Sequence, residues 1–218
     1  MARTTPDTAS IAHATQGAKL FAPSAARNAP DICNLLAQFA PTTGKALEIA
    51  SGTGQHSVAF AQKLPDLHWQ PTDIDTARRA SIDAYTSDSG LRNIAPALPL
   101  DACSPGWGAH NIGQSLIVVV NLLHLISTPE AEILITEAAR ALAPAGRFVI
   151  YGPFMRGGDL TSKNDAEFHA SLIGHDPDIG YKDDFDTLDM VEAAGLGIVE
   201  IVEMPANNLA LIGEKPIS

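Results

Sequence analysis

The chain has few basic residues, few cysteines and no long apolar run. Its 14 Lys and Arg stand against 25 Asp and Glu, a formal net charge of −11. Nucleic acid and anionic membrane surfaces are therefore poor partners. Cys33 and Cys103 lack the spacing of a zinc site or a disulfide framework. The most apolar run, residues 116–126, is too short to cross a bilayer and contains Asn121 and His124.

The composition that remains is that of a globular protein. Hydrophobic residues make up 45% of the 218 residues and charged residues 18%, which excludes wholesale disorder. Residues 1–23 are mostly small and polar, without the apolar block of a secretory signal. We expect a loose N-terminal segment over residues 1–23, one domain over 24–218, and a cytoplasmic location.

Predicted strands and helices alternate along the chain. Thr128 and Pro129 fit the N-cap and the first residue of a helix, and residues 152–165 resemble a loop. This alternation is typical of an α/β layered fold with a mainly parallel sheet. The predicted strands are residues 46–50, 67–72, 94–100, 115–120, 147–151, 198–202 and 209–212, and the predicted helices are residues 31–39, 55–64, 75–87, 128–142, 166–173 and 185–194.

Glycine and acidic residues follow the predicted strands. The first strand runs into Gly52 and Gly54, the second ends at Asp73, the third at Asp101 and the fourth at Asn121. Ligands of doubly wound sheets bind at these carboxyl ends, where an acid can accept hydrogen bonds from a ribose. Nicotinamide, flavin and S-adenosylmethionine sites share this pattern, and an ordinary strand-to-helix turn also fits it.

Two residues favour S-adenosylmethionine over a dinucleotide. Ser57 stands where the dinucleotide fingerprint G-x-G-x-x-G/A has its last small residue. Glu48 lies inside the first strand, where a buried carboxylate is costly without a partner such as a cationic ligand. Bonding of Glu48 to its own loop is the alternative.

These segments carry a family resemblance. Residues 47–56 (LEIASGTGQH) resemble motif one of the class I methyltransferases, with Ala50 in place of the first glycine, and residues 141–147 (ALAPAGR) are similar to the turn before their fifth strand. Together with Arg27, Asn28 and residues 69–73, 151–154 and 204–209, they resemble the methyltransferase-like 26 family (domain of unknown function 938) over about residues 24–212.

The resemblance implies a Rossmann-like seven-stranded sheet of order 3-2-1-4-5-7-6, with helices on both faces and the last strand antiparallel. It also implies S-adenosylmethionine as cofactor and S-adenosylhomocysteine as product. The implied cofactor residues are Glu48, Ala50, Gly52 and Gly54 around the methionine part, Asp73 at the ribose, Asp101 and Ala102 at the adenine, Asn121 and Leu122 by the sulfonium, and Ile74, with Arg27 and Asn28 as a lid or a helix cap.

The chemistry beyond the cofactor is less defined by the sequence. His124 is a candidate general base, although a packed histidine fits equally, and Tyr151, Phe154 and Asn207 are candidates for an acceptor pocket. The acidic stretch over residues 176–189 lacks the pattern of a calcium loop, so no metal is predicted. The leading hypothesis is a methyltransferase acting on a small molecule. A cofactor-binding scaffold without catalysis and an NAD-dependent oxidoreductase are the alternatives, and the oligomeric state stays open.

Overall fold

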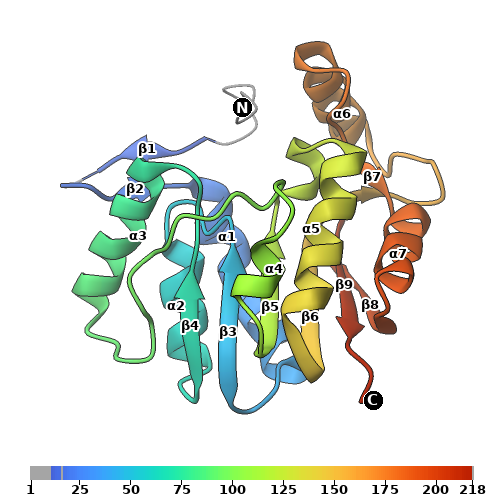
Figure 1. Cartoon of the computed structure of the whole chain (residues 1–218). Helices are drawn as coiled ribbons and strands as arrows, with labels where there is room; N and C mark the ends of the chain where they lie inside the picture. The colour runs from blue at the N-terminus through green and yellow to red at the C-terminus, as the bar shows by residue number, and fades with distance from the viewer. Residues whose placement is uncertain (1–10, 16, 218) are drawn as a thin grey trace.

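The computed structural model describes residues 11–15 and 17–217 (Figure 1). Its helices are α1 (Pro23–Phe39), α2 (Gln55–Lys63), α3 (Thr76–Ser89), α4 (Trp107–His110), α5 (Thr128–Ala141), α6 (Lys163–His175) and α7 (Asp184–Ala193). Its strands are β1 (His13–Ala14), β2 (Leu20–Phe21), β3 (Gly44–Ile49), β4 (Leu67–Pro71), β5 (Gln114–Val120), β6 (Leu142–Met155), β7 (Lys182–Asp183), β8 (Gly197–Met204) and β9 (Asn208–Glu214).

The main sheet has seven strands and confirms the predicted α/β class. Six strands follow the order β4-β3-β5-β6-β9-β8, and β7 pairs with the end of β6. The strands β4, β3, β5 and β6 are parallel, whereas β9 is antiparallel to both of its neighbours. The last strand in sequence is thus the antiparallel one, as expected.

Both faces of the sheet are buried, which explains the continuous apolar run of β5. Ile117 and Val119 pack on the side covered by α4, α5 and α7, and Leu116 and Val118 pack on the side of α1 and α2. The same alternation along β3 turns Leu47 toward the α5 side and its neighbours toward α2. Helices on both faces hold the carboxyl ends of β3, β5 and β6 at one edge.

The predicted strand over residues 94–100 is reduced to isolated bridges. Ile94 and Leu98 each form a single parallel bridge to β4 or the residue after it, and the Leu98 amide donates to the Pro71 carbonyl at 3.1 Å. Pro96 and Pro99 have no N–H to donate, so a continuous ladder cannot form. The segment still lies beside β4, at the position implied for the third strand.

Helix α1 is longer than predicted. The prolines at positions 23 and 30 both suit the start of a helix, and the structure begins the helix at Pro23 and keeps Pro30 inside it. The prediction of a start at residue 31 was therefore wrong. The extra two turns matter because they reach the carboxyl edge of the sheet.

Strand β6 and the N-terminal segment also differ from expectation. The strand continues to Met155, so the first residues of the predicted loop over 152–165 are extended. β1 and β2 pair as a short antiparallel hairpin before α1, whereas residues 1–10 lie outside the described residues. The division at residues 23 and 24 stays a prediction. No helix in the described part of the chain is long and apolar enough to span a membrane.

The N-cap of α5 is Ser127, not Thr128 as predicted. The Ser127 hydroxyl accepts from the Glu130 amide at 3.4 Å, and the Glu130 carboxylate accepts from the Ser127 amide at 2.7 Å. This reciprocal capping box satisfies two amides that would otherwise lack partners.

We expect Ser127→Ala to lower the free energy of unfolding by about 1 kcal/mol, because the α5 N-terminus loses its cap. Thr128→Ala is the matched control, since Thr128 is exposed and does not serve as the cap. Urea denaturation of both variants measures the difference. An equal loss in the two variants would contradict the assignment of the cap.

Candidate cofactor and acceptor site

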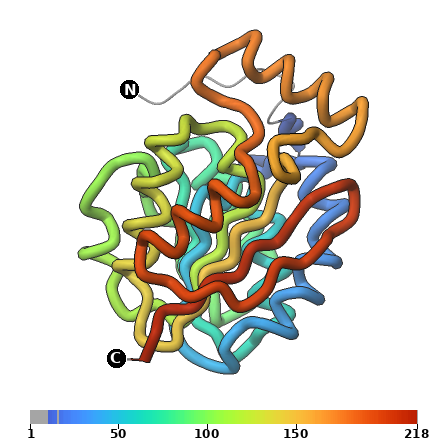
Figure 2. The backbone as a smooth tube through the Cα atoms, turned by 90° about the vertical axis from the view of Figure 1, so that its right-hand side faces the viewer, coloured from blue at the N-terminus to red at the C-terminus, as the bar shows by residue number. Residues whose placement is uncertain are grey.

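A cavity of about 630 Å³ lies at the carboxyl ends of β3, β5 and β6, a volume within the usual range for small-molecule sites. Its walls come from the β3–α2 turn, the start of α1, the segment after β5, the start of α6 and the β8–β9 turn. Figures 1 and 2 show the β1–β2 hairpin and α6 standing above this edge of the sheet. The topology thus gathers segments far apart in sequence.

The two glycines of the β3–α2 turn have different neighbours. Gly52 lines the cavity with a φ of +60°, and Ala50 before it has a φ of +53°. Gly54, with a φ of +90°, lies outside the cavity lining, and a Cβ there would come 2.6 Å from the Cα of Ile82 in α3. Gly52 therefore leaves backbone open toward a ligand, while Gly54 permits close packing of two helices.

Glu48 is buried beneath this turn and does not line the cavity. Its carboxylate accepts a hydrogen bond from the Ser57 hydroxyl of α2. Burial raises the pKa of Glu48 to about 7, Ser57 and Ser51 oppose that rise, and nearby Asp73 adds to it. The bonds thus come from serine side chains of the turn and the following helix, whereas the alternative considered from the sequence was bonding to backbone amides of its own loop.

Asp73 lies at the end of β4, buried behind the glycine turn. It accepts from the Gly52 amide through Oδ2 and from the Asp75 amide through Oδ1, both at 2.9 Å. Burial raises its pKa, and the bonds from the two amides and the nearby Arg78 work against that rise. Arg78 lines the cavity, and its Nη1 would lie 3.5 Å from a Cβ on Gly52.

The residues implied for the adenine, Asp101 and Ala102, lie outside the cavity lining. Ala102 is buried in the core. Asp101 accepts from the Cys103 amide at 3.0 Å and from the Ser104 hydroxyl at 2.8 Å. Ile74, another implied cofactor residue, is 48% exposed and also lies outside the lining.

Asn121 and Leu122 follow β5 and line the cavity. Asn121 has a φ of +56°, a conformation that asparagine tolerates better than most residues. Its amide donates to the Tyr151 carbonyl at 2.8 Å, so the turn is held against β6.

The start of α1 closes one side of the cavity with Arg27 and Asn28. Asn28 Oδ1 lies 2.8 Å from His56 Nε2, and Asn28 also bonds to the Tyr151 side chain. Burial lowers the pKa of His56 to about 4, although a bond to the Ala25 backbone opposes this. Asn28 thus ties α1 to α2 and β6, and the alternative of a helix cap was wrong because Arg27 and Asn28 lie inside α1, whose N-cap is Ala22.

His124 lies in the 3-10 turn Leu123–Leu125 and lines the cavity. Its ring meets Phe168 edge to face at a centroid distance of 5.8 Å and Tyr181 at 6.2 Å. Burial, with a smaller contribution from Lys182, lowers its pKa to about 3. The imidazole is therefore neutral at physiological pH, and its pKa lies far below the ordinary value of 6.5.

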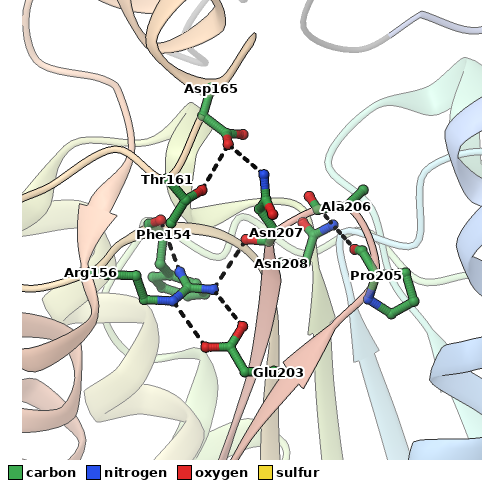
Figure 3. A network of polar contacts seen from close by, with 9 residues as sticks. All are labelled: Phe154, Arg156, Thr161, Asp165, Glu203, Pro205, Ala206, Asn207 and Asn208. Atoms are coloured by element: carbon green, nitrogen blue, oxygen red, sulfur yellow. Dashed lines mark hydrogen bonds and ion pairs between the residues drawn. The ribbon is translucent and has the colours of Figure 1, made fainter. Parts of the chain in front are cut away.

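Asp165 in the first turn of α6 also lines the cavity, opposite the α1 side chains. Its Oδ2 accepts from the Thr161 and Ser162 hydroxyls at 2.8 and 2.6 Å, and its Oδ1 accepts from the Tyr181 hydroxyl at 3.0 Å. Asn207 donates its side-chain amide to Oδ2 at 3.0 Å (Figure 3). Although burial raises the pKa of Asp165, these four bonds bring it below its usual range.

Asn207 belongs to the β8–β9 turn, and its main-chain carbonyl accepts a hydrogen bond. Arg156 Nη2 donates to that carbonyl at 3.2 Å and pairs with Glu203 at 3.1 Å (Figure 3). The predicted pocket residue Asn207 thus lies behind the lining and anchors the turn. Phe154 is a core residue that does not line the cavity, so its prediction as a pocket residue was wrong.

The structure brings together about half of the predicted site residues. Further cavity residues were missed, several of them with charged or aromatic side chains; Asp165, Phe168 and Tyr181 lie on or after α6, where no local pattern marks a pocket. Lining residues predicted from the sequence are Arg27, Asn28, Ala50, Gly52, Asn121, Leu122, His124 and Tyr151; predicted residues outside the lining are Glu48, Gly54, Asp73, Ile74, Asp101, Ala102, Phe154 and Asn207; missed residues include Asp31, Arg78, Asp165, Phe168 and Tyr181.

No cluster of three or more His, Cys, Asp and Glu side chains able to hold a metal ion occurs within residues 11–15 and 17–217. Asp183, in the acidic stretch, caps α7 by accepting from the Phe185 and Asp186 amides. Helix capping thus accounts for part of this stretch.

Sheet order and cavity position together define the class I methyltransferase fold. An O-methyltransferase family protein from Burkholderia thailandensis matches at 17% identity and a TM-score of 0.73, over 87% of this chain and 57% of its own. An O-methyltransferase family 2 protein from Planctomyces limnophilus, in complex with apigenin, matches at 20% and 0.72, over 88% and 60%. Human N-acetylserotonin methyltransferase, in complex with S-adenosylmethionine, matches at 11% and 0.71, over 87% and 52%.

These similarities show the fold, and the chain spans little more than half the length of the three proteins. A family described as "Protein of unknown function (DUF938)" matches residues 19–215. The chain belongs to this family.

Proposed function

We propose that the protein transfers a methyl group from S-adenosylmethionine to a small-molecule acceptor. The observation that carries the proposal is the cavity itself, in which the open backbone of Gly52 and the left-handed turn at Asn121 meet at the carboxyl ends of β3 and β5. Support comes from structural neighbours with small-molecule ligands, among them the protein in complex with apigenin. A cytoplasmic location and the lack of a nucleic-acid partner stay predictions from the sequence.

The residues present fit this cofactor in three respects. Gly52 has no side chain between the backbone and the cavity. Arg27 and Arg78 line the cavity and would pair with the carboxylate of the methionine part. Asp73, which accepts from the Gly52 amide, would hold the ribose, and the exposed Ile74 next to it in the chain would pack on the adenine.

When bound, the cofactor supplies an electrophilic methyl group on a sulfonium. The protein then has to align the acceptor and exclude water, and alignment alone lowers a barrier by about 7–11 kcal/mol. Asn121, Leu122, His124 and Tyr151 converge where β5 and β6 end, and we propose that they position the acceptor there. Helix α1 is tied to this region through the bonds of Asn28 to His56 and Tyr151.

His124 remains the candidate base in this proposal, in the form of a neutral imidazole. A base with a pKa of about 3 is poorly matched to neutral pH, so its contribution is expected mainly for an acceptor that arrives with an acidic proton. If His124 takes that proton, His124→Gln should lower the turnover rate roughly a hundredfold or more, while affinity for S-adenosylhomocysteine stays nearly unchanged.

The turnover rates of His124→Gln and the wild type are compared with a cell extract as the source of methyl acceptors. Full turnover per folded molecule in His124→Gln would contradict a role as base and leave alignment as the source of catalysis. A loss of unfolding free energy with unchanged turnover would identify a packing residue.

Selective ligand binding tests the proposal. S-adenosylmethionine and S-adenosylhomocysteine should raise the melting temperature, since a ligand at 100 times its Kd stabilises a fold by about 2.7 kcal/mol. NAD(H) should have no effect. A larger shift with NAD(H) would favour an oxidoreductase. Binding without conversion of S-adenosylmethionine by any extract would favour a scaffold.

A further inference from the structure

We propose that the acceptor half of the cavity recognises a flat aromatic molecule carrying an ammonium group, held by Asp165 and the rings around it. The inference rests on the proposed function and extends it to the substrate class. It concerns the group that anchors the acceptor, which is separate from the atom that receives the methyl.

The first observation is a buried negative charge without a cation. The four side chains that bond to Asp165 are all neutral, namely two aliphatic hydroxyls, a phenol and an amide. Within the described ranges 11–15 and 17–217, no Lys, Arg or His side chain forms an ion pair with Asp165. Neutral donors stabilise a carboxylate but leave its charge in place, so the cavity presents an anion to its occupant.

The two carboxylate oxygens of Asp165 are unequal. Oδ2 accepts three bonds, from Thr161, Ser162 and Asn207, whereas Oδ1 accepts one, from Tyr181. An ionised carboxylate has about four acceptor positions on its two oxygens. Oδ2 therefore fixes the group in place, and Oδ1 keeps room for a further donor such as an ammonium.

The second observation is the set of rings beside this carboxylate. Phe168 and Tyr181 meet edge to face at a centroid distance of 6.1 Å, His124 packs on both, and all three line the cavity with Asp165. Aromatic faces attract cations, and they also accept flat apolar rings. A carboxylate next to such rings matches an aromatic molecule with an ammonium group.

Helix capping does not account for this arrangement by itself. The Ser162 hydroxyl caps α6 by accepting from the Asp165 amide and also donates to the Asp165 carboxylate, as the Ser127 hydroxyl does with Glu130 at the start of α5. Only Asp165 of these two acids lines the cavity. It is also held from a distant segment by Asn207, whose turn is fixed in turn by Arg156. Tyr181 and Asn207, from two segments beyond the α6 cap, thus orient the carboxylate.

The test uses three probes that share a phenyl ring and differ in charge: 2-phenylethylamine, 2-phenylethanol and 3-phenylpropionate. Each is titrated calorimetrically into protein saturated with S-adenosylhomocysteine, so that no methyl is transferred. The amine should bind at least about tenfold more tightly than the alcohol, since a hydrogen bond between charged groups exceeds a neutral one by that margin. Arg27 also lines the cavity, and the carboxylate probe tests whether it dominates instead.

Asp165→Asn should weaken the amine at least about tenfold and change the alcohol by less than about twofold. Glu167→Gln is the matched control, because it removes one charge from the same helix at an exposed position, and it should leave all three affinities unchanged. If Asp165→Asn does not fold, the ratio of amine to alcohol affinity in the wild type decides.

Equal binding of amine and alcohol, tightest binding of the carboxylate, no binding of the amine at millimolar concentration, or an unchanged preference in folded Asp165→Asn would each overturn the proposal. The titrations are repeated without S-adenosylhomocysteine. Failure of S-adenosylhomocysteine to bind would count against the proposed function alone, and the probe series would still decide whether this half of the cavity selects an ammonium.

Discussion

Gly54→Ala is expected to lower the free energy of unfolding by about 3 kcal/mol or more. Two independent costs add at this position. An alanine is strained at a φ of +90°, and its Cβ would lie 2.6 Å from the Cα of Ile82, which is backbone and cannot rotate away. The α2 and α3 helices would have to separate, and urea denaturation measures the loss.

Gly90 provides the control for this substitution. It ends α3 with a φ of +67°, and a Cβ there would meet nothing within 4 Å. Gly90→Ala therefore carries the backbone strain alone, about 1–2 kcal/mol. Equal losses in the two variants would show that the contact with Ile82 does not restrict position 54.

Glu48→Gln should remove a large pH dependence of stability. Burial raises the pKa of Glu48 from 4.5 to about 7, so the folded protein binds this proton more tightly than the unfolded chain does. Stability from this group is complete below pH 4.5 and is lost as the pH rises to about 7. The difference corresponds to about 3 kcal/mol. The variant lacks this loss, because glutamine stays neutral while it still accepts a bond from Ser57.

Urea denaturation of both proteins at pH 4 and pH 8 measures the effect. From pH 4 to pH 8, the free energy of unfolding of Glu48→Gln should rise relative to that of the wild type. Ser57→Ala works in the opposite direction, since it removes a bond that favours the ionised carboxylate. Its free energy of unfolding should therefore fall more steeply with rising pH than that of the wild type. Parallel pH profiles of Glu48→Gln and wild type would disprove the raised pKa.

The parts of the fold that could be predicted are those written in short stretches of sequence. In the predicted strand over residues 115–120, positions 116–120 are all apolar, so the run indicates a strand buried on both faces, as β5 is. Helix α1 shows the limit, because Pro23 and Pro30 fit a helix start equally and only packing selects the first. Bridges take the place of a strand at Ile94 because neighbouring prolines lack N–H groups.

The same limit applies to the cavity. Gly52 and Asn121 were predictable, since each directly follows a strand whose end must face the ligand edge of the sheet. Asp165, Phe168 and Tyr181 were not, because they meet only after α6 folds over that edge. The hydrogen bond from Asn207 to Asp165 joins residues 42 positions apart, and no periodicity in either segment predicts this contact. The acceptor side of the site is a product of tertiary structure.

The position of β9 affects how the chain can fold during its synthesis on the ribosome. This strand is synthesised after every other strand, yet it lies between β6 and β8 (Figure 2). While the chain is being translated, β6 therefore exposes one unpaired edge and β8 has no place in the sheet. The turn that holds Asn207 reaches Asp165 only when this hairpin inserts. A nascent chain arrested before residue 208 should thus be a target for chaperones and proteases, although the glycine turn and its helix are already complete.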